Sequence, residues 1–144
     1  MSTPATYDDV NLILRLYEMR REQRLRDARA WFVKTFKPKT LDDLNQIAPP
    51  GSDENAYMRM VVTYWEMVAS FLTSGVLNED LFFQSGRELL LVYERIRPVL
   101  AQVREAFKDP NAYKNLETVA KRFIEHLNRT GPGSYEAFAA RVGS

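Results

Sequence analysis

The stretch NAYMRMVVTYWEMVASFLTS, residues 55–74, decides the fold. Its polar residues recur at spacings of three or four and form one narrow stripe, while the rest of the helix circumference is apolar. A helix that is apolar on most of its circumference lies at the centre of a fold. The segment therefore predicts a central helix over about residues 53–74, ended by Gly75 in the left-handed conformation.

The polar stripe of this helix has two open interpretations. Its members are Arg59, Thr63, Glu66, Ser70 and Ser74. The stripe either faces water, or it lines a groove and pairs with a polar position on another helix. A small-ligand or enzyme site around Glu66, Tyr64 and Arg59 is one form of the second interpretation.

The other strong periodic signals are also helical, and no segment alternates convincingly as a strand does. Helices are expected over residues 6–36, 40–48, 87–107, 109–130 and 134–144. Pro98 lies inside the third of these and is expected to kink it, because proline cannot donate to the Glu94 carbonyl. We therefore expect an all-α helical bundle in a single domain, residues 1–144. Its four main helices are a long basic N-terminal helix, the apolar central helix, the Pro-kinked helix and the helix that follows. The core helices span residues 53–130, and a short helix over 134–144 ends the chain.

Composition narrows the function classes. The 144 residues contain no cysteine and one histidine, His126, so disulfides, thiolate sites and His-rich metal sites are excluded. No nucleotide-binding or hydrolase motif occurs. The first residues lack the pattern of a signal peptide, and no apolar run approaches the roughly 18 residues that a membrane span needs. We expect a cytoplasmic protein with neither a cofactor nor a bound metal.

Positive charge gathers at the start of the chain, although the net charge is only +1. Residues 1–39 contain nine Lys or Arg against five Asp or Glu, and the arginines at 20, 21, 24, 26 and 29 fall within ten positions. On a helical wheel the core-facing stripe holds Val10, Leu14, Tyr17, Leu25, Ala28, Phe32 and Phe36. The arginines scatter over both flanks of that stripe, which argues against a helix that follows a nucleic-acid groove.

Arg21 is the exception, because the wheel places it inside the apolar stripe. A buried guanidinium without a partner is very costly. One hypothesis pairs Arg21 with Glu66 of the central helix. The alternative is that its long side chain reaches water where the helix leaves the bundle.

Phe82 and Phe83 form the best candidate for an exposed apolar interface. Asn78 is expected to cap a helical turn that contains them. Two adjacent side chains are not expected to face the same core, so one of them would remain on the surface.

Residues 61–126 resemble a family of small bacterial all-helical domains of unknown function. The resemblance is carried by Tyr64-Trp65-Glu66, Gly75, Asp80, Tyr93-Glu94, Pro98, Tyr113 and Glu117. Members of that family often carry a membrane helix before this domain, whereas the N-terminal helix here is basic. The resemblance implies the helical fold, implies no established activity, and marks Glu66 and Glu94 as more than ordinary surface acids.

From these observations we expect a non-enzymatic protein-interaction module. Its partner would be a second copy or another protein, bound through the 6–36 helix or the Phe82-Phe83 turn. The alternative is an anion or nucleic-acid binder that uses Arg20, Arg21, Arg24 and Arg26. A site around Glu66 is the third hypothesis.

Overall fold

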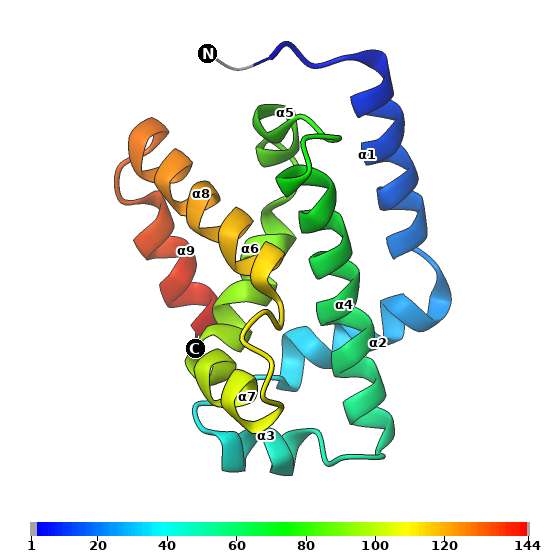
Figure 1. Cartoon of the computed structure of the whole chain (residues 1–144), viewed down its shortest axis with the longest axis vertical. Helices are drawn as coiled ribbons and strands as arrows, with labels where there is room; N and C mark the ends of the chain where they lie inside the picture. Colours follow the sequence, from blue (N-terminus) through cyan, green and yellow to red (C-terminus); the bar gives the residue numbers. More distant parts are fainter. Residues whose placement is uncertain (1–2, 144) are drawn as a thin grey trace.

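The computed structural model describes residues 3–143, and these are helical with no strand among them. The elements are α1 (Tyr7–Arg20), α2 (Gln23–Thr35), α3 (Leu41–Ile47), α4 (Asp53–Thr73), α5 (Glu79–Phe83), α6 (Arg87–Ile96), the 3₁₀ turn η1 (Arg97–Val99), α7 (Leu100–Ala106), α8 (Lys114–Thr130) and α9 (Ser134–Gly143). The all-α bundle expected from the periodicity is confirmed (Figure 1).

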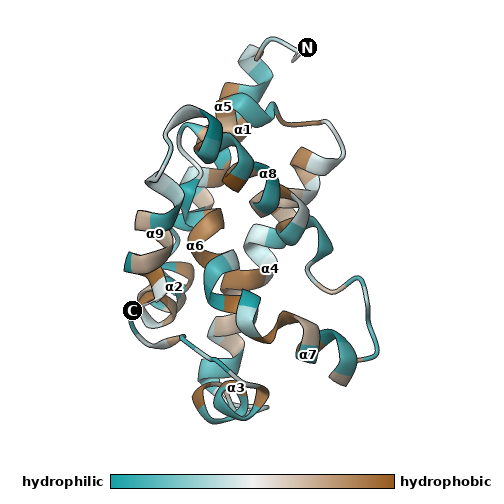
Figure 2. Cartoon of the chain, turned by 90° about the vertical axis from the view of Figure 1, so that its left-hand side faces the viewer, coloured by the Kyte–Doolittle hydropathy of each residue, from teal (hydrophilic) through white to brown (hydrophobic). Residues whose placement is uncertain are grey.

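Helix α4 is the centre of the bundle, as its apolar circumference predicts. It packs against α2, α6 and α8, buries seven residues, and exposes only Asp53, Glu54, Arg59 and Thr63 among its twenty-one. Helix α6 packs against α8 and α9 and buries seven of its ten residues. Figure 2 shows apolar residues along α6, which lies between α9 and α4 in that view.

The 6–36 segment forms two helices in place of the one expected. Helix α1 ends at Arg21, the C-cap, and α2 begins after Glu22. Glu22 has extended backbone, with φ −61° and ψ 140°, and its carboxylate accepts a hydrogen bond from the Leu25 amide at 3.1 Å. Glu22 therefore acts as an N-cap, a role that helical periodicity alone does not reveal.

This break changes which face of the N-terminal segment meets the core. Ala28, Phe32 and Phe36 are buried as expected, because they share the phase of α2. In α1 the wheel was wrong: Leu16 is buried, and the stripe through Leu14 faces outward. A wheel drawn through 30 residues assumes one continuous helix, and a two-residue turn removes that assumption.

The helix ends follow local capping chemistry. Thr6 and Thr40 each form a capping box with the aspartate three residues later. Gly75 follows α4 with φ +81°, the left-handed geometry that glycine adopts without strain. Pro98 lies in the 3₁₀ turn between α6 and α7, which confirms the expected interruption.

The start of α8 differs from the sequence expectation. The Asp109-Pro110 pair predicts a helix from residue 109, but the helix begins at Lys114. Residues 110–113 form turns, and Tyr113 is left-handed with φ 56° and ψ 34°. The α8 N-terminus consequently has no side-chain cap from its own N-cap residue.

A buried arginine joins three helices at the base of the core. Arg95 of α6 is 6% exposed, and its guanidinium donates to four carbonyls of residues 3–143, at 2.7–3.1 Å. Three of these carbonyls, at Phe32, Val33 and Phe36, end α2, and the fourth is that of Val142 in α9. Burial lowers the pKa of Arg95. The cation lies at the negative end of the α2 dipole and binds carbonyls of the last turn, of which Phe32 also accepts from the Phe36 amide.

None of the helices described in residues 3–143 has the length and apolar character that spanning a bilayer requires.

Replacing Arg95 with methionine should lower the free energy of unfolding by about 3 kcal/mol, because buried carbonyls lose charge-assisted hydrogen bonds. Urea unfolding followed by circular dichroism measures this. Arg122→Met is the matched control: Arg122 is 47% exposed and pairs at 3.1 Å with Glu79, which is also partly exposed. Its effect should stay within about 0.5 kcal/mol. Equal losses in the two variants would contradict the role assigned to Arg95.

Candidate functional site

The outer face of α1 carries a row of exposed apolar side chains. Tyr7 is 78% exposed, Val10 40%, Leu14 55% and Tyr17 50%. Their spacings of three, four and three match the a and d positions of a heptad, so they lie on one face of the helix. We call these four residues the α1 seam. Arg21 continues the same face one turn later, and its guanidinium lies 5.7 Å from the centroid of the Tyr17 ring.

Helix α1 lies at the edge of the molecule and buries only two of its fourteen residues, Asp9 and Leu16 (Figure 1). Polar contacts hold it at three points. At its start, the Asp9 carboxylate accepts from the Asn78 backbone amide at 2.9 Å, and the Asn78 side chain donates to the Thr3 carbonyl. The backbone amides of Thr6 and Asn78 hold the pKa of the Asp9 carboxyl below its usual value of 3.8.

The other two tethers attach the middle and the end of α1. The Tyr64 hydroxyl of α4 donates to the Leu16 carbonyl, and burial raises the pKa of Tyr64 to about 12. Arg20 bonds Glu88 of α6 at 3.1 Å, and Arg29 of α2 bonds the other carboxylate oxygen. One carboxylate therefore holds both α1 and α2.

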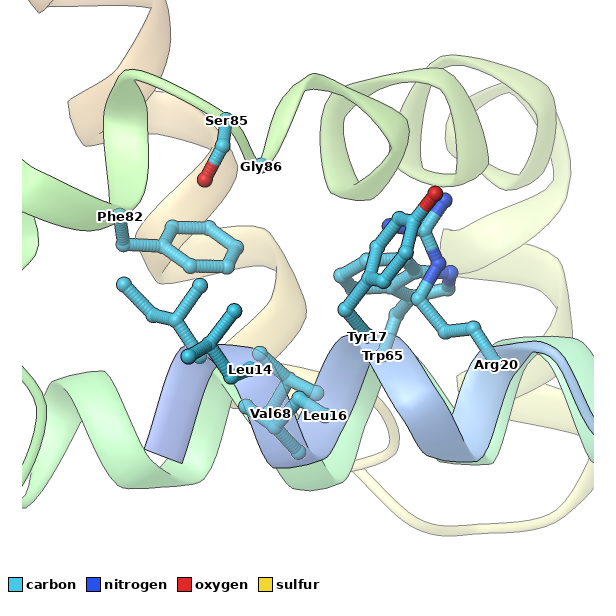
Figure 3. Close-up of a pocket in the computed structure, with 10 residues that line it drawn as sticks. Leu14, Leu16, Tyr17, Arg20, Trp65, Val68, Phe82, Ser85 and Gly86 are labelled. Carbon is cyan, nitrogen blue, oxygen red and sulfur yellow. The ribbon is translucent and has the colours of Figure 1, made fainter. Parts of the chain in front are cut away.

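An apolar pocket of about 250 Å³ lies beneath α1, between that helix, α4 and the α5–α6 turn. Figure 3 shows Phe82 and Ser85 at one end and Tyr17, Trp65 and Arg20 at the other, with aliphatic side chains between them. The Arg20 guanidinium lies 5.1 Å from the Trp65 ring centroid and 5.6 Å from that of Tyr17. The pocket thus combines an apolar body with one cationic end.

The structure does not bring Arg21 and Glu66 together. The sequence hypothesis required Arg21 to face the interior, but α1 ends there and the residue is exposed. Of the two alternatives, the solvent-exposed guanidinium is the one observed. Glu66 has partners of a different kind on α8.

Glu66 caps the N-terminus of α8 from across the fold. Its carboxylate accepts from the Leu116 amide at 2.8 Å, the Asn115 side chain at 2.8 Å and the Asn115 amide at 3.4 Å. These two amides lie in the first turn of α8, where Tyr113 supplies no side-chain cap. A carboxylate at the positive end of the helix dipole is favourable. Glu66 therefore fixes the position of α8 against α4.

The rest of the polar stripe does not converge on one site. Arg59 and Thr63 are exposed, and Ser70 is half-buried with its hydroxyl donating to the Met67 carbonyl. Arg59 donates to Asn55 of its own helix, and the Tyr64 hydroxyl is occupied by α1. Within the described chain, no group of three or more potential ligands could hold a metal ion.

Glu94 also joins separate elements. Its carboxylate accepts from the Tyr135 hydroxyl of α9 at 2.7 Å and pairs with Arg97. Burial and this hydrogen bond raise the pKa of Tyr135 to about 12. Glu66 and Glu94, the two acids that the resemblance singled out, thus both link helices.

Phe82 and Phe83 are not an exposed interface, because both are buried, at 4% and 7% exposure. Their ring centroids lie 6.4 Å apart, and the two rings contact different neighbours. Phe83 stacks on Phe123 of α8 with centroids 4.4 Å apart, while Phe82 faces the α1 pocket. Gly86 permits this: a Cβ there would lie 2.3 Å from the Phe82 ring.

The five arginines at positions 20 to 29 do not form one binding surface. Arg20 and Arg29 attach their helices to Glu88, whereas Arg21, Arg24 and Arg26 are exposed. Sequence reasoning did not identify the shared carboxylate, Asp9 or Arg95. A helical wheel drawn for one continuous helix does not indicate that Arg20 lies at the end of a pocket. The burial of Arg95, in contrast, was indicated by the sequence, because Leu90, Leu91 and Val92 extend the apolar surface of α6 beyond a single stripe.

Acidification or loss of the Asp9 carboxylate should release the start of α1. A lowered folded-state pKa means that the tether contributes stability above pH 3.8 and loses it as pH falls through the folded value. In Asp9→Ala, amide hydrogen exchange at residues 10–14 should accelerate at neutral pH, while exchange in α4 stays slow.

Asp8→Ala is the control, because Asp8 lies in the same first turn, carries the same charge and is exposed. Its exchange rates should match those of the unaltered chain. Equal acceleration in both variants would mean that helix-dipole charge, and not the Asn78 contact, holds this end of α1.

Comparison with known proteins matches the chain to a family model. No curated protein matches the chain, and no solved structure matches it. The matching model covers residues 5–123, from the cap of α1 into α8, and so includes the seam, the pocket and the Glu66 cap. The chain therefore belongs to the family described as Domain of unknown function (DUF4760).

Proposed function

We propose that the chain is a non-enzymatic interaction module that self-associates through the α1 seam. The observation that carries the proposal is the row of Tyr7, Val10, Leu14 and Tyr17, exposed at heptad spacing on a peripheral helix. Apolar side chains in this pattern bury their surface by pairing with another helix. The second copy supplies such a helix.

The charges along α1 favour an antiparallel arrangement of the two helices. Arg21 is exposed where the seam ends, one turn after Tyr17. An antiparallel pair centred near Leu14 places the two Arg21 side chains at opposite ends of the contact and opposes the two helix dipoles favourably. A parallel pair would instead set like charges side by side. The outcome is a symmetric dimer with Leu14 close to the two-fold axis.

The association is expected to be weak. A contact between two helices of fourteen residues is small, and small interfaces belong to the weak or transient class, with a Kd on the order of 10 μM. A module of this kind would assemble and disassemble with concentration.

Sedimentation equilibrium of the full chain tests the seam. The unaltered chain should dimerise, and Leu14→Glu should abolish dimerisation because it buries a charge at the centre of the seam. Met19→Glu is the matched control: Met19 is also exposed on α1, at 45%, but lies off the seam. A chain that remains monomeric at millimolar concentration, or a dimer unaffected by Leu14→Glu, would overturn the proposal.

The antiparallel register has its own test. Because the chain has no cysteine, Leu14→Cys should cross-link two copies on oxidation, whereas Tyr7→Cys, which only a parallel pair would bring together, should not. A cross-link at position 7, or none at position 14, would exclude this register.

A further inference from the structure

We propose that the pocket beneath α1 binds a medium-chain organic carboxylate, with its apolar chain inside the pocket and its carboxylate on Arg20. This inference does not require self-association, although Leu14 and Tyr17 of the seam also line the pocket.

The shape and lining of the pocket favour an apolar chain. Its walls include Ile13, Leu16, Val68 and Phe82, and its volume is about 250 Å³. An apolar cavity of about 150 Å³ holds a benzene molecule, so by proportion this pocket accommodates about ten carbon atoms. Within the described chain, none of the residues that line it is Asp or Glu.

The charge at the end of the pocket favours an anionic head. Glu88 is the ion-pair partner of both Arg20 and Arg29, so the three groups together carry an excess positive charge. The Nε of Arg20 is buried and has no hydrogen-bond acceptor among residues 3–143. A buried donor without an acceptor is costly, and a carboxylate supplies the acceptor. The rings of Tyr17 and Trp65 lie against the Arg20 guanidinium at this end of the pocket (Figure 3).

A second pocket of similar size shows why the charge matters. It lies between α3, α4 and α7, has a volume of about 260 Å³, and is lined by Leu44, Met58 and Phe107 among others. Its lining within the described residues contains no charged side chain. Purely apolar ligands would have no preference for the α1 pocket over this one, whereas a carboxylate finds its cation only beneath α1.

Titration of the full chain with decanoate, below its micelle concentration, tests the inference. Decanol supplies the same chain without the charge, and acetate supplies the charge without the chain. The two tryptophans provide the readout: Trp65 lines the pocket and Trp31 does not. In NMR spectra, the indole N–H signal of Trp65 should shift saturably with decanoate, whereas that of Trp31 should not shift. Decanol should bind at least about tenfold more weakly than decanoate, and acetate should produce no saturable shift.

Variants separate the head contact from a general loosening of α1. Arg20→Gln should reduce the decanoate-to-decanol affinity ratio to about one, while Arg24→Gln, which removes an exposed cation of α2 outside the Arg20–Glu88–Arg29 group, should leave the ratio within about twofold. Ile13→Trp should fill the pocket and abolish binding of both ligands. A substitution that merely loosens α1 should weaken decanoate and decanol alike, so the ratio of the two affinities within one variant still reports the contact with the carboxylate.

Three results would overturn the proposal. They are equal affinities for decanoate and decanol in the unaltered chain, a ratio in Arg20→Gln that matches the unaltered chain, and decanoate binding that survives Ile13→Trp. The last two would place bound decanoate elsewhere on the molecule.

Discussion

The guanidinium of Arg95 is the contact on which the arrangement of the bundle depends. It binds the carbonyls that end α2 and one near the end of α9, so a single α6 side chain fixes two helices far apart in the sequence. A cation surrounded by carbonyl oxygens at helix C-termini needs no carboxylate, because the helix ends carry the complementary partial charge. The contact also joins residues 32 and 142, so a growing chain cannot complete it until nearly all of the described residues have been made.

Around this fixed core, the features that could serve function lie at the periphery, on α1. One side of α1 presents the seam, and the other covers a pocket with a cationic end. Leu14 and Tyr17 belong to both surfaces, since they are half exposed and also line the pocket. Glu66 and Glu94, by contrast, link helices of the bundle.

The sequence predicted the features that depend on local chemistry or on a strong hydrophobic pattern. Capping by Thr6 and Thr40, the left-handed Gly75, the interruption at Pro98 and the central position of α4 are of this kind. Expectations failed where a distant contact decides, and also where an uncommon residue caps a helix locally. Glutamate is not among the preferred N-cap residues, so the sequence does not mark Glu22 as the start of α2, and the reversal of face in α1 follows from that one residue.

Tertiary contacts also explain the two incorrect site hypotheses. Phe82 and Phe83 are both buried because α5 is covered by α8 on one side and by α1 on the other, which adjacency in sequence cannot reveal. Glu66 does pair with a group on another helix, which is one of the two interpretations of the polar stripe. That group is the N-terminus of α8 and not a cation. A helix end carries no residue type by which a sequence pattern could identify it.

The polar character of the α1 tethers has a thermodynamic consequence. Detaching α1 breaks a few hydrogen bonds and ion pairs and exposes far less apolar surface than unfolding the core. Heat-capacity change and denaturant dependence both scale with the surface exposed. Release of α1 is therefore nearly silent in calorimetry and in urea titrations, which report the core, and the state of this helix has to be followed with probes placed on the helix itself.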